Sequence, residues 1–132
     1  PYLFSYFKGE EWRTQKQVKR LLAEYFTDRP DGIPGNDDTG TMSAWAIFNM
    51  IGFYPDCPGL PEYTLTTPVF NKVTIRLDPK WYKEKELVIE SNRTQPGTLY
   101  INKVLLNGKK FNQYRITHDE LVHSQRILFD LK

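Results

Sequence analysis

The sequence contains a single cysteine, Cys57, and only two histidines among its 132 residues. One cysteine cannot form a disulfide within the chain, so no disulfide framework supports the fold. The same shortage argues against a zinc site built wholly from this chain, because structural zinc takes four cysteine or histidine ligands. The cysteine count leaves the cellular compartment open.

Long apolar runs and a basic stripe are also missing. The apolar runs are far shorter than the about 20 residues that span a bilayer, so we expect no membrane partner. The net charge is +2, with lysines and arginines scattered among acids, so nucleic acid is not expected as a partner either. No signal peptide is visible and the chain begins at Pro1, so we interpret it as a piece of a longer protein.

The first part of the chain has a helical pattern. Apolar residues recur at roughly helical spacing over residues 4–26, with a break near residues 8–11. Pro30 and Gly32 then stop the helix, because proline cannot continue it and glycine tolerates the turn.

A second helix is expected over residues 41–51, ended by Gly52 and followed by a proline-rich loop over residues 53–63. This helix has little polar face and is expected to be buried on most sides. The segment hardly supplies partners for its large apolar side chains, so we infer a larger helical body around them; these side chains are Phe4, Phe7, Phe26, Trp45 and Phe48.

Beyond the loop, apolar residues alternate with a period of two. Strands are expected over residues 72–77, 86–91, 98–111 and 126–131, with Asn107-Gly108 as a hairpin turn inside the third stretch. Helices followed by strands predict an α+β fold, with N-terminal helices and then an antiparallel β-sheet or sandwich. We place the boundary between a helical segment, residues 1–62, and a β-rich subdomain, residues 63–132.

The loop ahead of the second helix carries Asn36, Asp37 and Asp38 in succession. One interpretation is a helix cap, since a carboxylate accepts backbone N–H groups and suits the positive end of the helix dipole. Three such residues exceed what a cap needs, and two adjacent carboxylates repel each other. Calcium, which takes carboxylate and carboxamide oxygens, is a second interpretation, and water activation by a carboxylate is a third.

Residues 32–75 read GIPGNDDTGTMSAWAIFNMIGFYPDCPGLPEYTLTTPVFNKVTI. The succession Gly-Asn-Asp-Asp, Gly-Thr-Met-Ser-Ala-Trp, Gly-Phe-Tyr-Pro and Pro-Glu-Tyr resembles the C-terminal region of the α-mannosidases of glycoside hydrolase family 92. The opening PYLFSYFKGEEWRTQKQVKRLL is similar to the stretch that precedes the loop in that family. The resemblance covers most of the chain and is least specific in the β-rich tail.

The resemblance implies a calcium-dependent exo-α-mannosidase, of the α-1,2-mannosidase kind, that inverts the anomeric carbon of mannose-containing glycans. Asp38 best matches the position of the general base, with Asp37 as the alternative, and Asn36 and Asp38 are the expected calcium ligands. The family's general acid is a glutamate from an earlier segment, so the chain is expected to carry half of an active site and to be inactive alone. The missing N-terminal part of the same polypeptide is then a partner, and the helices would complete an α/α barrel.

Trp12 and Gln15 match a family stretch near the catalytic centre, which makes them candidate substrate-binding residues; a helix-face anchor is the structural alternative for Trp12. His118 and His123 are expected at the surface. The family resemblance also implies a secreted, periplasmic or cell-surface protein. The rival hypothesis is a non-catalytic module that binds carbohydrate or serves as a structural β-rich domain.

Overall fold

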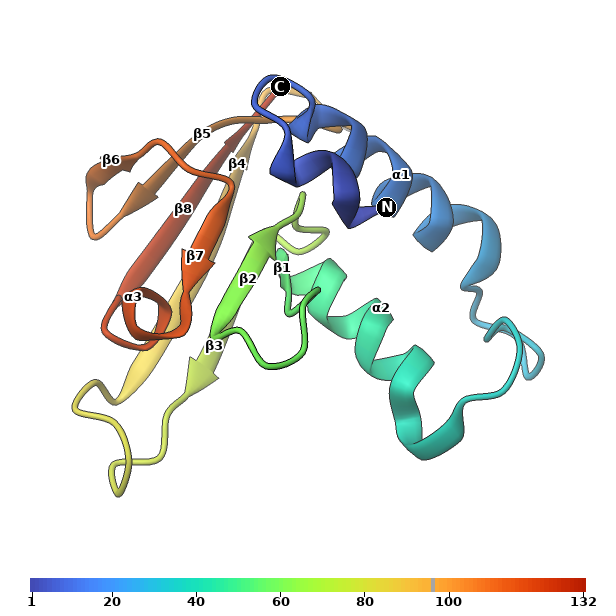
Figure 1. Ribbon diagram of the computed structural model, residues 1–132, viewed down its shortest axis with the longest axis horizontal. Helices are drawn as coiled ribbons and strands as arrows, with labels where there is room; N and C mark the ends of the chain where they lie inside the picture. The colour runs from blue at the N-terminus through green and yellow to red at the C-terminus, as the bar shows by residue number, and fades with distance from the viewer. Residues whose placement is uncertain (96) are drawn as a thin grey trace.

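The computed structural model describes residues 1–95 and 97–132. A helical half packs beside a β-rich half, as the sequence predicts for an α+β fold (Figure 1). The helical elements are η1 (Tyr2–Tyr6), α1 (Glu11–Tyr25), η2 (Asp38–Gly40), α2 (Thr41–Ile51) and α3 (His118–Val122). The strands are β1 (Phe53–Tyr54), β2 (Glu62–Leu65), β3 (Lys72–Arg76), β4 (Glu86–Arg93), β5 (Ile101–Leu106), β6 (Lys109–Phe111), β7 (Arg115–Thr117) and β8 (Arg126–Leu131).

The break predicted near residues 8–11 separates η1 from α1, which confirms the reading of two helical pieces. Thr14, Gln15 and Val18 form the buried face of α1 at helical spacing. The helix ends at Tyr25, one turn after Leu22, whose carbonyl accepts the N–H of Phe26.

Helix α2 spans the predicted residues 41–51, and Gly52 ends it with a φ of 119°, a left-handed conformation that favours glycine. Only Ala46 and Asn49 are buried on this helix, and Ile47 is 52% exposed. The expectation that α2 is buried on most sides is therefore wrong for the described residues, because no element among them covers the face that carries Ile47.

Two sheets form the β-rich half. The larger has the strand order β3-β4-β8-β5-β6, and the smaller has the order β1-β2-β7. The predicted strands and the Asn107-Gly108 hairpin turn are confirmed, and both turn residues have positive φ, as this type of turn requires. The larger sheet is mixed, because β8 returns along β4 in a parallel register while it pairs antiparallel with β5.

The hydrophobic core lies against the larger sheet, where Ile127, Phe129 and Leu131 of the central strand β8 are 0–1% exposed. Phe53 belongs to the same core, and its strand β1 pairs with β2. The stretch expected to be a proline-rich loop thus contributes strand pairing at both its ends. The smaller sheet crosses the boundary placed between residues 62 and 63, which falls inside β2.

No helix among residues 1–95 and 97–132 combines the length and the apolar character that crossing a membrane requires.

Candidate active site

The acidic loop (residues 36–39) lies in the connection between α1 and α2. The rings of Phe26, directly after α1, and Trp45, on α2, stack with 5.4 Å between their centroids, which joins the two ends of this connection. Gly32 holds a tight turn within it, since its N–H donates to Arg29 and its carbonyl accepts from Thr27. A Cβ atom at Gly32 would lie 2.2 Å from the Thr27 carbonyl oxygen, so only glycine fits there. Packing and turn chemistry therefore fix where the acidic loop begins.

Asp37 acts as a cap for α2. Its Oδ1 accepts the backbone N–H groups of Met42 and Ser43 at 2.8 and 3.0 Å, and its Oδ2 accepts the Ser43 hydroxyl at 2.5 Å. The Ser43 hydroxyl, then the Ser43 and Met42 N–H groups, hold the pKa of Asp37 below its ordinary value. The capping interpretation thus describes Asp37, whose two oxygens are both occupied.

Asp38 and Asn36 are exposed. The Asp38 backbone carbonyl accepts the hydroxyls of Thr39 and Thr41, each at 2.6 Å, which anchors the start of η2. Among the described residues nothing donates a hydrogen bond to the Asp38 carboxylate. The two neighbouring acids therefore differ: one is committed to the helix, and the other presents a free carboxylate at the surface of the loop.

Asn36 and Asp38 could provide some, but not all, of the oxygen ligands that a calcium ion needs. Asn36 and Asp38 offer carboxamide and carboxylate oxygens, which are the ligands that calcium takes. The described part of the chain holds no group of three or more His, Cys, Asp and Glu side chains placed to bind a metal ion. Calcium takes about 6–8 oxygens, so these two side chains could fill only part of its coordination sphere.

Trp12 and Gln15 belong to the first turns of α1, and the start of α1 lies at the opposite end of the helical half from the connection between α1 and α2 (Figure 1). Both line a cavity of about 530 Å³ between the start of α1 and the end of β8. Gln15 is 2% exposed, and its Oε1 accepts the backbone N–H of Ile101 at 2.9 Å. The structure thus does not bring the predicted substrate-binding pair together with Asp37 and Asp38 within this chain.

The glutamates at the start and end of α1 all have local partners, and Glu11 accepts the N–H of Gly9 at 2.8 Å. Glu10 pairs with Arg13 at the start of the helix, and Glu24 pairs with Arg20 at 2.7 Å on its exposed surface. Both are helix-surface ion pairs of ordinary spacing.

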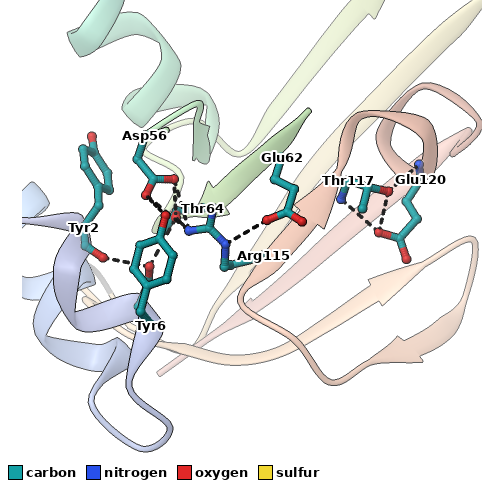
Figure 2. Close-up of polar contacts among 9 residues, drawn as sticks. Tyr2, Tyr6, Asp56, Glu62, Thr64, Arg115, Thr117 and Glu120 are labelled. Atoms are coloured by element: carbon teal, nitrogen blue, oxygen red, sulfur yellow. Dashed lines mark hydrogen bonds and ion pairs between the residues drawn. The ribbon is translucent and has the colours of Figure 1, made fainter. Parts of the chain in front are cut away.

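A polar cluster that the sequence does not reveal joins η1 to the smaller sheet (Figure 2). Arg115 on β7 contacts Asp56 and Glu62 at 3.2 Å each, and its guanidinium lies 4.2 Å from the centre of the Tyr6 ring. The Tyr6 and Thr64 hydroxyls donate to Asp56. No residue spacing signals this cluster, because Asp56 and Arg115 are 59 positions apart.

The two histidines differ in environment. His123 is exposed, as expected, whereas His118 is half-buried at the start of α3. Its Nδ1 lies 2.9 Å from the Tyr63 hydroxyl and its Nε2 lies 3.4 Å from that of Tyr82. The surface expectation is wrong for His118, because the β3–β4 connection folds over it.

Replacing Asp37 with Asn is expected to lower the thermal unfolding midpoint, because the charge at the start of α2 and the acceptor for Ser43 are lost. The hydrogen bonds from Ser43 hold the pKa of Asp37 below its ordinary value. Its stabilising contribution is therefore complete above the pKa of the unfolded chain and is lost as the pH falls through the folded-state pKa. Differential scanning calorimetry should give a constant midpoint difference from pH 7 to about pH 5 that shrinks below about pH 4. A difference that is the same at every pH would contradict the charged cap.

The catalytic-domain model of glycosyl hydrolase family 92 matches residues 1–132. A curated relative described as an uncharacterized secreted glycosidase, from Arthroderma benhamiae, is 29% identical over 114 residues. That match covers 86% of this chain and 14% of the relative.

Solved structures of the family share the fold. An α-mannosidase of family 92 from Bacteroides thetaiotaomicron, solved with mannoimidazole, is 32% identical with a TM-score of 0.89. An inverting mannosidase of the family from the same species is 34% identical with a TM-score of 0.84. This chain is covered to 99% in both matches and spans 17% of each of those chains. The chain therefore belongs to glycosyl hydrolase family 92 and represents part of its catalytic domain.

Proposed function

We propose that this chain is part of an inverting, calcium-dependent exo-α-mannosidase in which Asp38 is the general base. The observation that carries the proposal is the free, exposed carboxylate of Asp38 beside Asp37, whose carboxylate accepts three hydrogen bonds from the start of α2. A base must have an oxygen available for the attacking water, and the Asp38 carboxylate offers both of its oxygens while that of Asp37 is engaged as a cap. Two solved relatives described as mannosidases support mannose as the sugar.

Inversion needs a second carboxyl group on the opposite face of the sugar. The two groups of an inverting pair lie roughly 6.5–9.5 Å apart, which leaves room for the water. Asp37 is adjacent to Asp38 and serves as a cap. Glu10 and Glu24 are in surface ion pairs, and Glu11 accepts the N–H of Gly9. We therefore assign the general acid to a part of the polypeptide outside these residues.

Asn36 and Asp38 would hold the calcium ion through their side-chain oxygens, together with ligands from elsewhere in the polypeptide. When bound, the ion would supply positive charge that holds sugar hydroxyls and keeps a neighbouring carboxylate ionised. The residues of this chain would keep the loop in place, through the Asp37 cap and the stack of Phe26 on Trp45.

The proposed substrate is an α-1,2-linked mannose at the end of a glycan, and the proposed location is outside the cytoplasm. The second point is supported by the relative from Arthroderma benhamiae, which is described as secreted.

The proposal is tested on the full-length protein with an α-mannoside followed by proton NMR. We expect β-mannose to appear first, because inversion of an α-linkage gives the β-anomer. Chelation is expected to abolish the rate, and calcium to restore it. Early release of α-mannose would overturn inversion, and a rate unaffected by chelation would overturn the calcium dependence.

The isolated 132-residue chain is expected to release no mannose from a simple α-mannoside, with or without calcium, because it lacks the general acid. A coupled assay for free mannose, run beside the full-length protein at equal molarity, measures this. Turnover by the isolated chain would show that a carboxylate within it serves as the acid.

A further inference from the structure

The cavity of about 530 Å³ at the start of α1 is separate from the acidic loop, which lies at the other end of the helical half. Its volume lies within the about 300–1,000 Å³ of small-molecule sites in proteins. Its walls come from α1, from the segment before β5 and from the end of β8. The lining combines aromatic rings with groups of both charges; it includes Glu11, Trp12, Gln15, Tyr100, Tyr114 and Lys132.

Gln15 is the polar side chain of this cavity that the fold holds in a fixed orientation. Its side chain is buried at 2% exposure, and its Oε1 is fixed by the N–H of Ile101 at 2.9 Å. That bond sets which way the amide points. Among residues 1–95 and 97–132 no acceptor takes the hydrogens of its Nε2, although Gln15 lines the cavity. In the described part of the chain, the fully buried side-chain polar atoms without a partner are on Thr98 and Arg115, so the Gln15 Nε2 atom is open to the cavity. A ligand oxygen at this place could accept its hydrogens.

Trp12 supplies an apolar surface beside this donor. It is 42% exposed, and its ring is held edge-on by Tyr100 at 6.3 Å and covered by the Arg13 guanidinium at 5.2 Å. A flat aromatic face with polar groups around it suits a ligand with one apolar face and a hydroxylated edge.

Glu11 and Tyr114 complete the polar edge. Burial raises the pKa of the Tyr114 phenol, and the nearby negative charge of Glu11 adds to this shift, so the phenol stays protonated as a donor. Glu11 accepts the N–H of Gly9 through Oε2. Donors and acceptors thus converge on one cavity whose lining carries charges of both signs, which favours a neutral ligand.

We propose that this cavity is a second sugar site, which takes a neutral hexose ring of a glycan with its C–H face on Trp12 and a hydroxyl on the Gln15 amide. The site is independent of hydrolysis at the acidic loop. It would hold a second part of the glycan on the protein while the acidic loop acts elsewhere.

The test uses saturation-transfer difference NMR of methyl α-mannoside on the full-length protein, with mannoimidazole added to occupy the catalytic centre. We expect a residual sugar signal in the wild type that is lost in Trp12→Ala and kept in Trp81→Ala, a control at a tryptophan that is 72% exposed and remote from the cavity. Gln15→Glu keeps the acceptor for Ile101 and removes the donor, so the apparent Kd is expected to rise about threefold to tenfold.

Equal signals in wild type and Trp12→Ala would overturn the proposal, whether or not the acidic loop binds mannose. If Trp12→Ala does not fold, Gln15→Glu decides: an unchanged apparent Kd in a folded Gln15→Glu would overturn it. Because the comparison is between variants of the cavity, failure of this site is distinguishable from failure of the proposed hydrolysis.

Discussion

Replacing Asp38 with Asn in the full-length protein is expected to lower kcat for α-mannoside hydrolysis by about 10²–10⁴-fold, the usual contribution of a positioned general base. Asparagine keeps the shape of the side chain but cannot take a proton from the attacking water. The thermal midpoint should stay unchanged, because no described residue donates a hydrogen bond to the Asp38 carboxylate. Steady-state kinetics together with calorimetry measure the two effects on one preparation.

Asp37→Asn is the matched comparison for this experiment. Its carboxylate caps α2, so its replacement is expected to lower stability more than the replacement of Asp38. A larger loss of kcat in Asp37→Asn than in Asp38→Asn, at a temperature where both are folded, would move the base to Asp37. Unchanged rates in both variants would favour the rival hypothesis of a non-catalytic module.

Local chemistry made much of this fold predictable. Gly52 ends α2 and Asn107-Gly108 turns the β5–β6 hairpin, and each does so through a backbone conformation that few other residues adopt. The apolar alternation likewise identified β3, β4 and β8, because a strand with one buried face repeats every two residues.

Pairings between distant segments were not predictable from local patterns. The parallel register of β4 with β8 joins residues that are far apart in the sequence, such as Val88 and Arg126, so no local pattern predicts it. Gln15 reads as a polar helix residue in the sequence, yet it is buried against Ile101, 86 positions away. The same holds for His118, which the β3–β4 connection covers.

The sequence predicts which residue types occupy the acidic loop, but it does not predict which of Asp37 and Asp38 caps α2. The sequence shows two adjacent acids, and either could cap the helix. Only the geometry assigns the cap to Asp37, because the chain turns through positive φ at Thr39 and Gly40 before α2 begins. This turn directs the Asp37 side chain towards the N–H groups of Met42 and Ser43 and leaves Asp38 outside.

Replacing Arg115 with Met is expected to destabilise the protein by about 3–5 kcal/mol, because it leaves the buried carboxylate of Asp56 without its cation. The Asp56 side chain is 3% exposed, and it would keep only the hydroxyls of Tyr6 and Thr64. The urea midpoint measures the loss. Arg20→Met is the control: its ion pair with Glu24 is about half exposed, so a change of at most about 0.5 kcal/mol is expected. A midpoint for Arg115→Met equal to that of the control would mean that the hydroxyls alone satisfy Asp56, and that the cluster does not tie η1 to the sheet through charge.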